Sequence, residues 1–304
     1  MSRARYRYRY GGQRGFTLVE AIIVIIITGI VGAMVALFIR LPVQGYVDSA
    51  ARAQLLDVAD TTLARMKRDI RLAVPNSVRV VSAGGVVYLE FLQSKIGGRY
   101  LGEEDAVPGG DVLSWTDAAD TSFTVVGAMP TGKQAITPHD YLVVYNLGQG
   151  QEPGNAYDCS IACNRASIDT VAGNRVTLKA NPFARQVAAF GVALMSPGSS
   201  FQVFTSAVTY ACDPARHTLM RYWNYQIDPV QPTSLASLTA PDPNKAGTGA
   251  SAALLADGVV LACAFNDEGL AGNHSALITL DLTVGDGSSG NLTLVQQVHV
   301  DNTP

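Results

Sequence analysis

The residues with the clearest chemical potential form one short stretch, Gly15 to Glu20, which reads Gly-Phe-Thr-Leu-Val-Glu. Nineteen uncharged residues, Ala21 to Ile39, follow it directly. A carboxylate at the depth of a bilayer costs free energy and usually serves a function. Glu20 is therefore the first candidate functional residue. The glycine at position 15 is the second, because a small residue at such a junction is typical of a proteolytic cleavage site.

A basic leader precedes this stretch. It contains no acid and five arginines, namely Arg3, Arg5, Arg7, Arg9 and Arg14. By the positive-inside rule these arginines keep the N-terminus on the cytoplasmic side. An ordinary secretory signal has its small-residue cleavage site after the apolar region, whereas here Gly11, Gly12 and Gly15 come before it. Cleavage after Gly15 would remove the arginines and leave the apolar segment on the mature chain. An uncleaved signal anchor is the alternative that hydrophobicity alone permits.

The apolar segment is long enough to cross a membrane as a helix. From Phe16 to Ile39 there are 24 residues, which at about 1.5 Å per residue span roughly 36 Å. A hydrocarbon core is about 30 Å thick. The sequence therefore predicts one transmembrane helix in this segment.

The Gly15-Phe16 junction, with Glu20 four residues beyond it, resembles the class III signal peptide of type IV pilins and type II secretion pseudopilins. The resemblance implies that prepilin peptidase cuts between Gly15 and Phe16 and that Phe16 is then N-methylated. It also implies that Glu20 offers its carboxylate to the N-terminal ammonium of a neighbouring subunit. Such a pair must first offset desolvation, so we expect it to set register between subunits more than to add stability.

Composition bounds the rest of the chain. At 304 residues and 48% hydrophobic content, it can form one large domain or two small ones. The formal net charge is −3, and removing the five positive charges of the leader leaves −8. No basic patch survives that removal, which argues against a nucleic-acid partner.

Four cysteines follow the apolar segment: Cys159, Cys163, Cys212 and Cys263. An even number in an exported chain indicates two disulfides. Three pairings are possible, and the sequence leaves all three open. We favour Cys159–Cys163, which closes a small loop, together with Cys212–Cys263, which closes a loop of about 50 residues. A metal site is the alternative, but the spacings do not resemble paired zinc knuckles.

No catalytic or cofactor motif is evident. The sequence lacks a phosphate-binding loop, His-Glu-x-x-His and Gly-x-Ser-x-Gly, and its four histidines (His139, His217, His274 and His299) are scattered. Acids near glycines, namely Asp267-Glu268, Asp281 and Asp286, are candidates for a calcium loop, but their spacing does not match one. We therefore predict no enzyme, no cofactor and ordinary acidic turns.

A second helical pattern follows the apolar segment. Pro42 is expected to kink the helix there without ending it. An apolar stripe then recurs at helical spacing: Val47, Leu55, Ala59, Leu63, Met66, Ile70 and Ala73. The opposite side is charged, with Arg52, Asp57, Asp60, Arg65, Lys67, Arg68 and Arg71. The pattern predicts an amphipathic helix that lays one face on a core and ends at Val74-Pro75-Asn76.

Beyond Asn76 the period changes to two, which predicts strands. The expected strands are Ser77–Ser82, Val86–Gln93, Ser122–Met129, Tyr141–Asn146, Arg175–Lys179, Gln202–Ala211, Leu219–Gln226, Val259–Phe265, Ala276–Val284 and Leu292–Val300. Hairpin turns are expected at residues 172–175 and 286–291. Long loops are expected at 97–120, 147–164 and 228–250, where recognition surfaces would lie.

The predicted fold class is α+β, with a long kinked N-terminal helix packed on a β-rich head, as in pilins. The expected segments are a cleaved leader (1–15), a transmembrane and fibre-core helix (16–40), an amphipathic helix (41–75) and a periplasmic or extracellular head (76–304). The resemblance implies other pilin or pseudopilin subunits, prepilin peptidase and an inner-membrane assembly platform as partners. It places the chain in the inner membrane, with one pass and the head in the periplasm, and afterwards in a fibre.

A head of about 230 residues favours a minor subunit over the bulk fibre subunit. The chain is most similar to an O-type minor pilin of the mannose-sensitive haemagglutinin pilus, a relative of the J-type pseudopilin. The supporting stretches are Phe16–Pro42, Gln44–Asp48, Val208–Asp213 and Val298–Val300. Glu20 argues against the K-type tip subunits, some of which lack that carboxylate. Two functions remain open: assembly and capping of a fibre, or a recognition module such as an adhesin carried at its tip.

Overall fold

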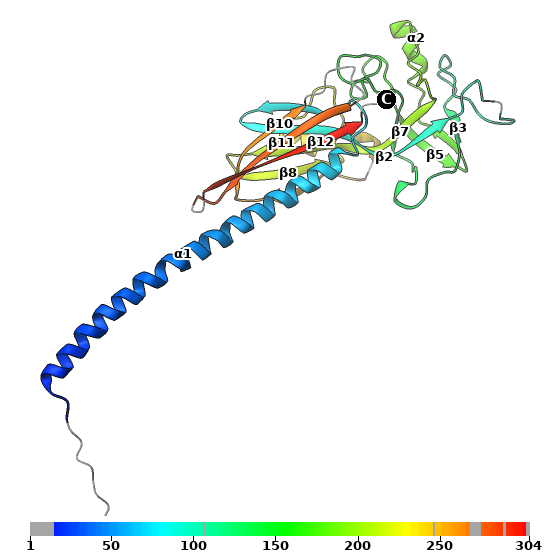
Figure 1. Ribbon diagram of the computed structural model, residues 1–304. Helices are drawn as coiled ribbons and strands as arrows, with labels where there is room; N and C mark the ends of the chain where they lie inside the picture. Colours follow the sequence, from blue (N-terminus) through cyan, green and yellow to red (C-terminus); the bar gives the residue numbers. More distant parts are fainter. Residues whose placement is uncertain (1–14, 106, 246, 268–274, 288–289, 302–304) are drawn as a thin grey trace, which may run out of the picture. The chain divides into compact units, whose positions relative to one another are not determined.

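A long N-terminal helix and a β-rich head make up the chain, which is mixed α+β and pilin-like (Figure 1). The computed structural model describes residues 15–105, 107–245, 247–267, 275–287 and 290–301. The chain forms two compact units, residues 1–52 and 53–304.

Helix α1 spans Leu18–Ile70 and is continuous through Pro42. A proline inside a helix removes one backbone hydrogen bond, which this helix accommodates. The expected segments 16–40 and 41–75 are thus parts of one helix, and the helix ends at Ile70, earlier than expected. Residues 71–72 turn directly after the helix, and Asn76, with a φ of 57°, lies in a second turn before β1.

Within the second unit, α1 packs its apolar stripe on the head. Leu55, Ala59, Leu63, Met66 and Ile70 are at most 5% exposed, and all five belong to one hydrophobic core with strands of both sheets. This stripe confirms the predicted helical spacing. Val47 is the exception: it lies in the first unit and is 57% exposed.

A polar contact also fixes this end of α1. The Asp69 carboxylate accepts hydrogen bonds from Arg221 Nε at 2.9 Å and from the Tyr210 hydroxyl at 2.8 Å. Arg221 also donates to Gln93 Oε1 at 3.1 Å, and its guanidinium lies 4.7 Å from the centroid of the Trp223 ring. Burial raises the pKa of Tyr210, and the nearby Asp69 carboxylate adds to the effect. The helix is therefore attached by an oriented ion pair as well as by apolar packing.

The described part of the head contains twelve strands in two sheets. Their bounds are β1 (Arg79–Ala83), β2 (Val86–Tyr100), β3 (Ser122–Val126), β4 (Tyr141–Val143), β5 (Arg165–Ala172), β6 (Arg175–Leu178), β7 (Ser200–Asp213), β8 (Thr218–Trp223), β9 (Ser251–Ala256), β10 (Val260–Asp267), β11 (Ser275–Gly285) and β12 (Asn291–Asp301). Short helices are α2 (Ala184–Phe190) and α3 (Leu235–Thr239), with 3₁₀ turns η1 (Gly132–Gln134) and η2 (Pro243–Lys245).

Two long antiparallel strands, β2 and β7, organise the larger sheet. Their paired halves Val87–Leu92 and Ala207–Cys212 form a flat sheet in the order β1-β2-β7-β8-β9. Their other halves close a ring in which each strand pairs with two neighbours, β2-β3-β6-β5-β4-β7 and back to β2. The ring encloses a separate core that includes Tyr100, Phe123 and Phe201. Strands β2 and β7 therefore contribute residues to separate hydrophobic cores.

The transition between the two halves lies at a bulge. The β2–β7 register shifts between Leu92 and Ser94 and again between Ser94 and Ile96, and bulges bend a sheet locally. Gly98 follows directly, and a Cβ at this position would lie 2.5 Å from Phe201 Cζ. Residue 98 is glycine because the Phe201 ring packs on its backbone. The expected loop at 97–120 is therefore wrong at its start, since β2 continues to Tyr100.

The sheet β10-β11-β12 joins α1 in covering one face of the flat sheet, and the shared core includes Val208, Ile278 and Val298. Loops cover the opposite face, where Tyr157 and Tyr225 are at most 2% exposed. In this layer Arg79 Nε donates to Glu90 Oε2 at 2.6 Å, and the Arg79 guanidinium lies 3.6 Å from the Tyr157 ring centroid. Arg79 also donates to the carbonyl oxygens of Asp228 and Pro229, so a buried cation holds the 228–250 loop to the sheet.

Most expected strands are present, but β5, β9, α2 and α3 were not predicted. Strand β9 reads Ser-Ala-Ala-Leu-Leu-Ala, and alanine is depleted in strands. In strand β5 the two large apolar residues, Ile168 and Val171, are three positions apart across a register shift, which breaks the period of two. The hairpin expected at 172–175 is confirmed, since Ala172 pairs with Arg175 across the turn.

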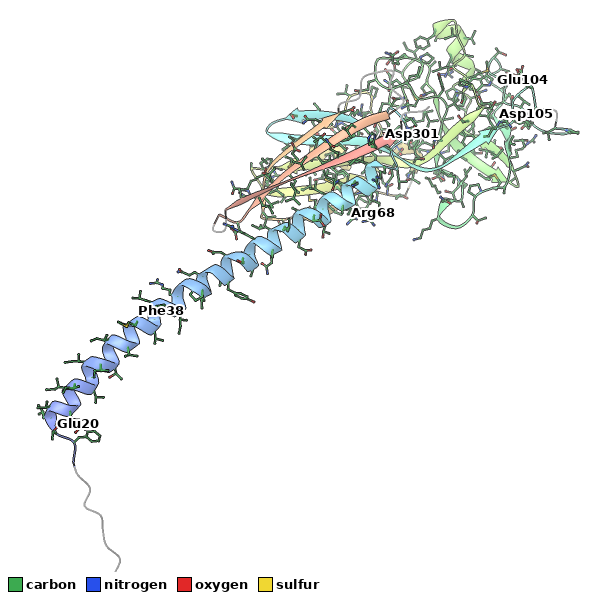
Figure 2. The ribbon with its side chains drawn as sticks, viewed as in Figure 1. Glu20, Phe38, Arg68, Glu104, Asp105 and Asp301 are labelled. Atoms are coloured by element: carbon green, nitrogen blue, oxygen red, sulfur yellow. A yellow bond between two sulfur atoms is a disulfide. The ribbon has the colours of Figure 1, made fainter. Side chains whose placement is uncertain are left out.

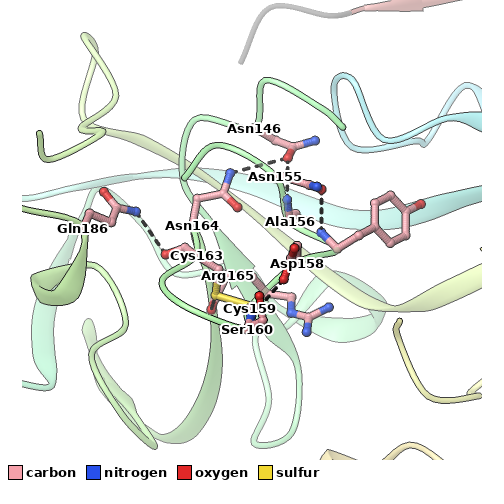
Figure 3. The surroundings of a disulfide bond; sticks show 11 residues. Asn146, Asn155, Ala156, Asp158, Cys159, Ser160, Cys163, Asn164, Arg165 and Gln186 are labelled. Atoms are coloured by element: carbon pink, nitrogen blue, oxygen red, sulfur yellow. Dashed lines mark hydrogen bonds between the residues drawn. A yellow bond between two sulfur atoms is a disulfide. The ribbon is translucent and has the colours of Figure 1, made fainter. Parts of the chain in front are cut away.

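Two disulfides lie in the head, Cys159–Cys163 and Cys212–Cys263, which is the pairing that the sequence analysis favoured. The second joins β7 to β10 and so links the two sheets. The first closes a small loop that Figure 3 shows beside Gln186 of α2, which donates from Nε2 to the Cys163 carbonyl at 3.0 Å. The disulfide loop and α2 are therefore held together.

Replacing Asp69 with Asn should lower the free energy of unfolding of the head by about 1–3 kcal/mol, because Arg221 then loses a charged acceptor in a partly buried site. Urea unfolding of the full chain in detergent, followed by tryptophan fluorescence, measures the change. The matched control is Asp60→Asn, since Asp60 is exposed on the same helix. Equal effects of the two substitutions would show that the contact does not stabilise the head.

Removing the two disulfides should have unequal effects. In the chain-entropy model a bridge stabilises more when it closes a longer loop. Cys212→Ala/Cys263→Ala, with a separation of 51 residues, should therefore cost about 4 kcal/mol, and Cys159→Ala/Cys163→Ala, with a separation of 4, about 2 kcal/mol. Chemical denaturation of the two double variants under oxidising conditions checks the order, and a reversed order would contradict it.

Candidate functional site

The sequence-predicted site residues Gly15, Phe16 and Glu20 lie at the start of α1. Thr17 caps the helix: its Oγ1 accepts a hydrogen bond from the Glu20 backbone N–H at 3.2 Å, and its carbonyl accepts from Ala21 N–H at 3.1 Å. A threonine at the N-cap satisfies donors that the first helical turn would otherwise leave unpaired. The helix therefore begins at a defined residue, two positions after Phe16.

This start was visible in the sequence but was not predicted. Thr17-x-x-Glu20 has the spacing of a capping box, in which Ser or Thr at the N-cap is followed three residues later by Glu or Gln. An acid in the first turn also complements the positive end of the helix dipole. Glu20 can therefore stabilise the start of the helix, in addition to the pairing between subunits that the resemblance implies.

The Gly15–Phe16 bond lies outside the helix and is accessible. Gly15, Phe16 and Thr17 have no regular secondary structure, and the Phe16 residue is 81% exposed. No heavy atom comes within 4 Å of an ideal Cβ built at Gly15. A peptidase needs an exposed, non-helical backbone at the bond it cuts, and this junction provides one. The leader arginines lie outside the described residues.

Beyond the junction α1 is apolar on all sides. Its most apolar window has a mean hydropathy of 3.0 with none of that window buried within the chain, and by length and composition this helix can cross a membrane. Figure 2 shows side chains of this segment, Phe38 among them, projecting away from the helix. Phe38 is 81% exposed and Ile25 71%. Glu20 is exposed in the first turn of this surface.

Thr28 is the one polar side chain between Ala21 and Ile39, and it is satisfied within the helix. Its hydroxyl donates to the carbonyl of Val24, one turn earlier. Such back-bonding hides a hydroxyl from an apolar medium. Glu20 is thus the only residue from Phe16 to Ile39 that brings a charge into this surface.

Glu90 is a buried carboxylate of the head. Burial raises the pKa of Glu90, and the Arg79 guanidinium opposes this shift. Glu90 is 0% exposed and accepts a further hydrogen bond from the Tyr225 hydroxyl at 2.8 Å. A carboxylate enclosed in this way cannot meet a substrate, so Glu90 holds the fold.

The metal candidates are not brought together. Asp281 lies in the middle of β11, paired with Ala264 and Val295, whereas Asp286 follows the end of that strand. Among the described residues there is no group of three or more His, Cys, Asp or Glu that could hold a metal ion. Glu268 and His274 lie outside the described residues.

Comparison with known protein families identifies a motif around the start of α1. Residues 11–36 match the family model described as the prokaryotic N-terminal methylation motif. No curated protein and no solved structure matches the chain. The matched residues include the Gly15–Phe16 junction, Glu20 and much of the apolar surface. The motif supports a type IV pilin-like or pseudopilin-like protein that is processed by prepilin peptidase, anchored in a membrane and assembled with other pilin subunits.

Proposed function

We propose that this chain is a minor subunit of a type IV pilus of the mannose-sensitive haemagglutinin kind. In this proposal prepilin peptidase cuts between Gly15 and Phe16, Phe16 is N-methylated, and α1 passes from the inner membrane into the core of the fibre. The leader faces the cytoplasm and the head faces the periplasm. The main support is the apolar surface of α1, which is exposed among the described residues of the first unit.

The length of that surface supports assembly over simple anchoring. Leu18 to Arg52 is 35 residues of helix within the first unit, or roughly 52 Å at about 1.5 Å per residue. A hydrocarbon core of about 30 Å covers only part of this length. Val43, Tyr46 and Val47 lie beyond the uncharged run and are still 53–76% exposed. Apolar side chains outside the lipid indicate a protein partner, and neighbouring α1 helices would fit that description.

Glu20 suits a role in subunit register. Cleavage would create an ammonium group at Phe16, one turn before the Glu20 carboxylate of each subunit. In an apolar medium the carboxylate is costly until it is paired. Pairing it with the ammonium of a neighbour would therefore favour one axial offset between helices over others. The same carboxylate would be tolerated before assembly because it lies at the end of the span.

The head favours a minor role. The second unit has three hydrophobic clusters, two disulfides and a closed ring of strands. Packing of α1 against other helices does not require a head of this size. A large head of this kind suits a position at the end of a fibre, where space is not limited by neighbours above it. A J-type minor pseudopilin of a type II secretion system is the second candidate, because the same long helix and single large head would serve a secretion fibre equally.

Replacing Gly15 with Val should block removal of the leader, because a branched side chain at the scissile junction does not fit a site built for glycine. Cells that carry the assembly machinery should then accumulate the longer precursor, seen as slower migration on a gel. Gly12→Val is the matched control and should be processed normally. Normal processing of the Gly15 variant would contradict the proposed cleavage position.

Replacing Glu20 with Gln should leave membrane insertion intact and impair assembly. The Thr17 cap uses the backbone N–H of Glu20, so the substitution keeps the helix start while it removes the charge. Cross-linking or co-purification of neighbouring subunits should fall at least tenfold, since a charge-assisted contact contributes about 1.5–3 kcal/mol. Asp48→Asn, an exposed acid further along α1, is the control. Wild-type assembly of the Glu20 variant would exclude the register role.

A further inference from the structure

A cavity of about 460 Å³ lies beside the Cys159–Cys163 disulfide. Its walls come from the disulfide loop, the start of β5, the segment before α2 and the η2 turn. These segments are far apart in the sequence, so the fold builds the cavity. Its volume falls within the range of small-molecule sites, about 300–1,000 Å³. The function proposed above does not use it.

The charged side chains that line this cavity are all cations: Arg165, Lys179 and Arg185. None of the lining residues is Asp or Glu. The sign of this charge is opposite to that of the formal net charge of the whole chain, which is −3. Like charges gathered in one concave site raise the local concentration of anions. The sign of the charge therefore points to an anionic ligand.

Arg165 is held in place without being neutralised. Its guanidinium lies 5.2 Å from the centroid of the Tyr141 ring. Within the described part of the chain, no acceptor is hydrogen-bonded to its side-chain nitrogens, and Nη1 is buried. Buried donors without acceptors are rare in folded proteins. Burial lowers the pKa of this guanidinium, which is the cost that a bound anion would offset.

Two acids, Asp242 and Asp228, act on Arg165 through their charge, and neither forms an ion pair with it. Asp242 is 1% exposed, and its Oδ1 accepts hydrogen bonds from the Tyr141 hydroxyl at 2.6 Å and from Asn244 N–H at 2.9 Å. Its Oδ2 has no partner among the described residues and forms no ion pair with Arg165. The two acids thus soften the positive potential, while the half-buried Arg165 still lines the cavity.

The other residues that line the cavity include a hydrogen-bonded cation, an exposed cation and apolar side chains. Lys179 Nζ donates to Asn244 Oδ1 at 2.7 Å, which orients the ammonium at the cavity. Arg185 is exposed in the first turn of α2 and makes no ion pair within the described residues. Ile161, Pro182 and Pro243 supply apolar surface. A ligand for this site has one anionic group and a compact, less polar body.

We propose that this cavity binds a small carboxylate ligand of about the size of one sugar unit. The planar carboxylate matches the fork of a guanidinium and pairs with it in bidentate fashion. Arg165 and Lys179 would hold the carboxylate, and Arg185 would close over it from the rim. The apolar wall would receive the body of the ligand. An acidic sugar and the C-terminus of a peptide both present this chemistry.

Ligand-observed NMR with the full chain in detergent tests the proposal. The probes are glucuronate, N-acetylalanine, inorganic phosphate and glucuronamide, which is the neutral counterpart of glucuronate. We expect glucuronate or N-acetylalanine to bind and glucuronamide to bind at least tenfold more weakly, because the charge-assisted hydrogen bonds are lost. Comparing the first two identifies an acidic sugar or a peptide terminus as the source of the carboxylate.

Variants locate the binding. Arg185→Gln changes an exposed side chain, so the fold should be kept, and it should weaken the carboxylate probe about tenfold. Arg165→Gln should weaken it at least as much where the variant folds. Arg71→Gln, an exposed arginine outside the cavity, is the matched control and should bind as the wild type does. Absence of carboxylate binding, equal binding of glucuronamide or phosphate, or an equal loss in the Arg71 and Arg185 variants would overturn the proposal.

Discussion

The constraint on which the rest of the structure depends is the uncovered apolar surface of α1. From Leu18 to Ile39 every large apolar side chain is exposed, and none of the most apolar window is buried in the chain itself. Water cannot be its environment, because exposed apolar surface of this extent drives association. In the proposed function lipid covers this surface first and neighbouring helices cover it later. Three features lie at the N-terminal end of this surface: the Thr17 cap, the exposed Gly15–Phe16 bond and the Glu20 charge. A change of environment would be controlled at this end.

The same helix meets a different demand in the second unit. There its apolar residues form one stripe, Leu55 to Ile70, and the head supplies the surface that covers them. Asp69 and Arg221 add a directional contact to this non-directional packing. The head also has a ring core and a loop-covered face that do not involve α1. Stability of the head and association of the first unit are therefore separate properties, and substitutions can address one without the other.

Much of this could be predicted from the sequence, and the failures have physical reasons. The Gly15–Glu20 stretch, the apolar run and the Leu55–Ile70 stripe are local patterns that need no tertiary information. Strand β9 is alanine-rich, so its local propensity does not predict a strand. It forms because it pairs with β8 in an antiparallel sheet. A loop was expected from residue 97, but the glycine at 98 makes room for Phe201 from a distant strand. The cavity could not be predicted, because Arg165, Lys179 and Arg185 are brought together by the ring of strands and the disulfide loop.

The central claim is that the mature chain begins with the apolar helix and no longer has its basic leader. The most direct measurement is the N-terminal residue of the wild-type protein, taken from the membranes of cells that make it and read by peptide mass spectrometry. The account predicts a terminal peptide that starts at an N-methylated Phe16. A chain that keeps the leader arginines, or one cut after Ile39 so that the apolar segment is lost, would contradict it.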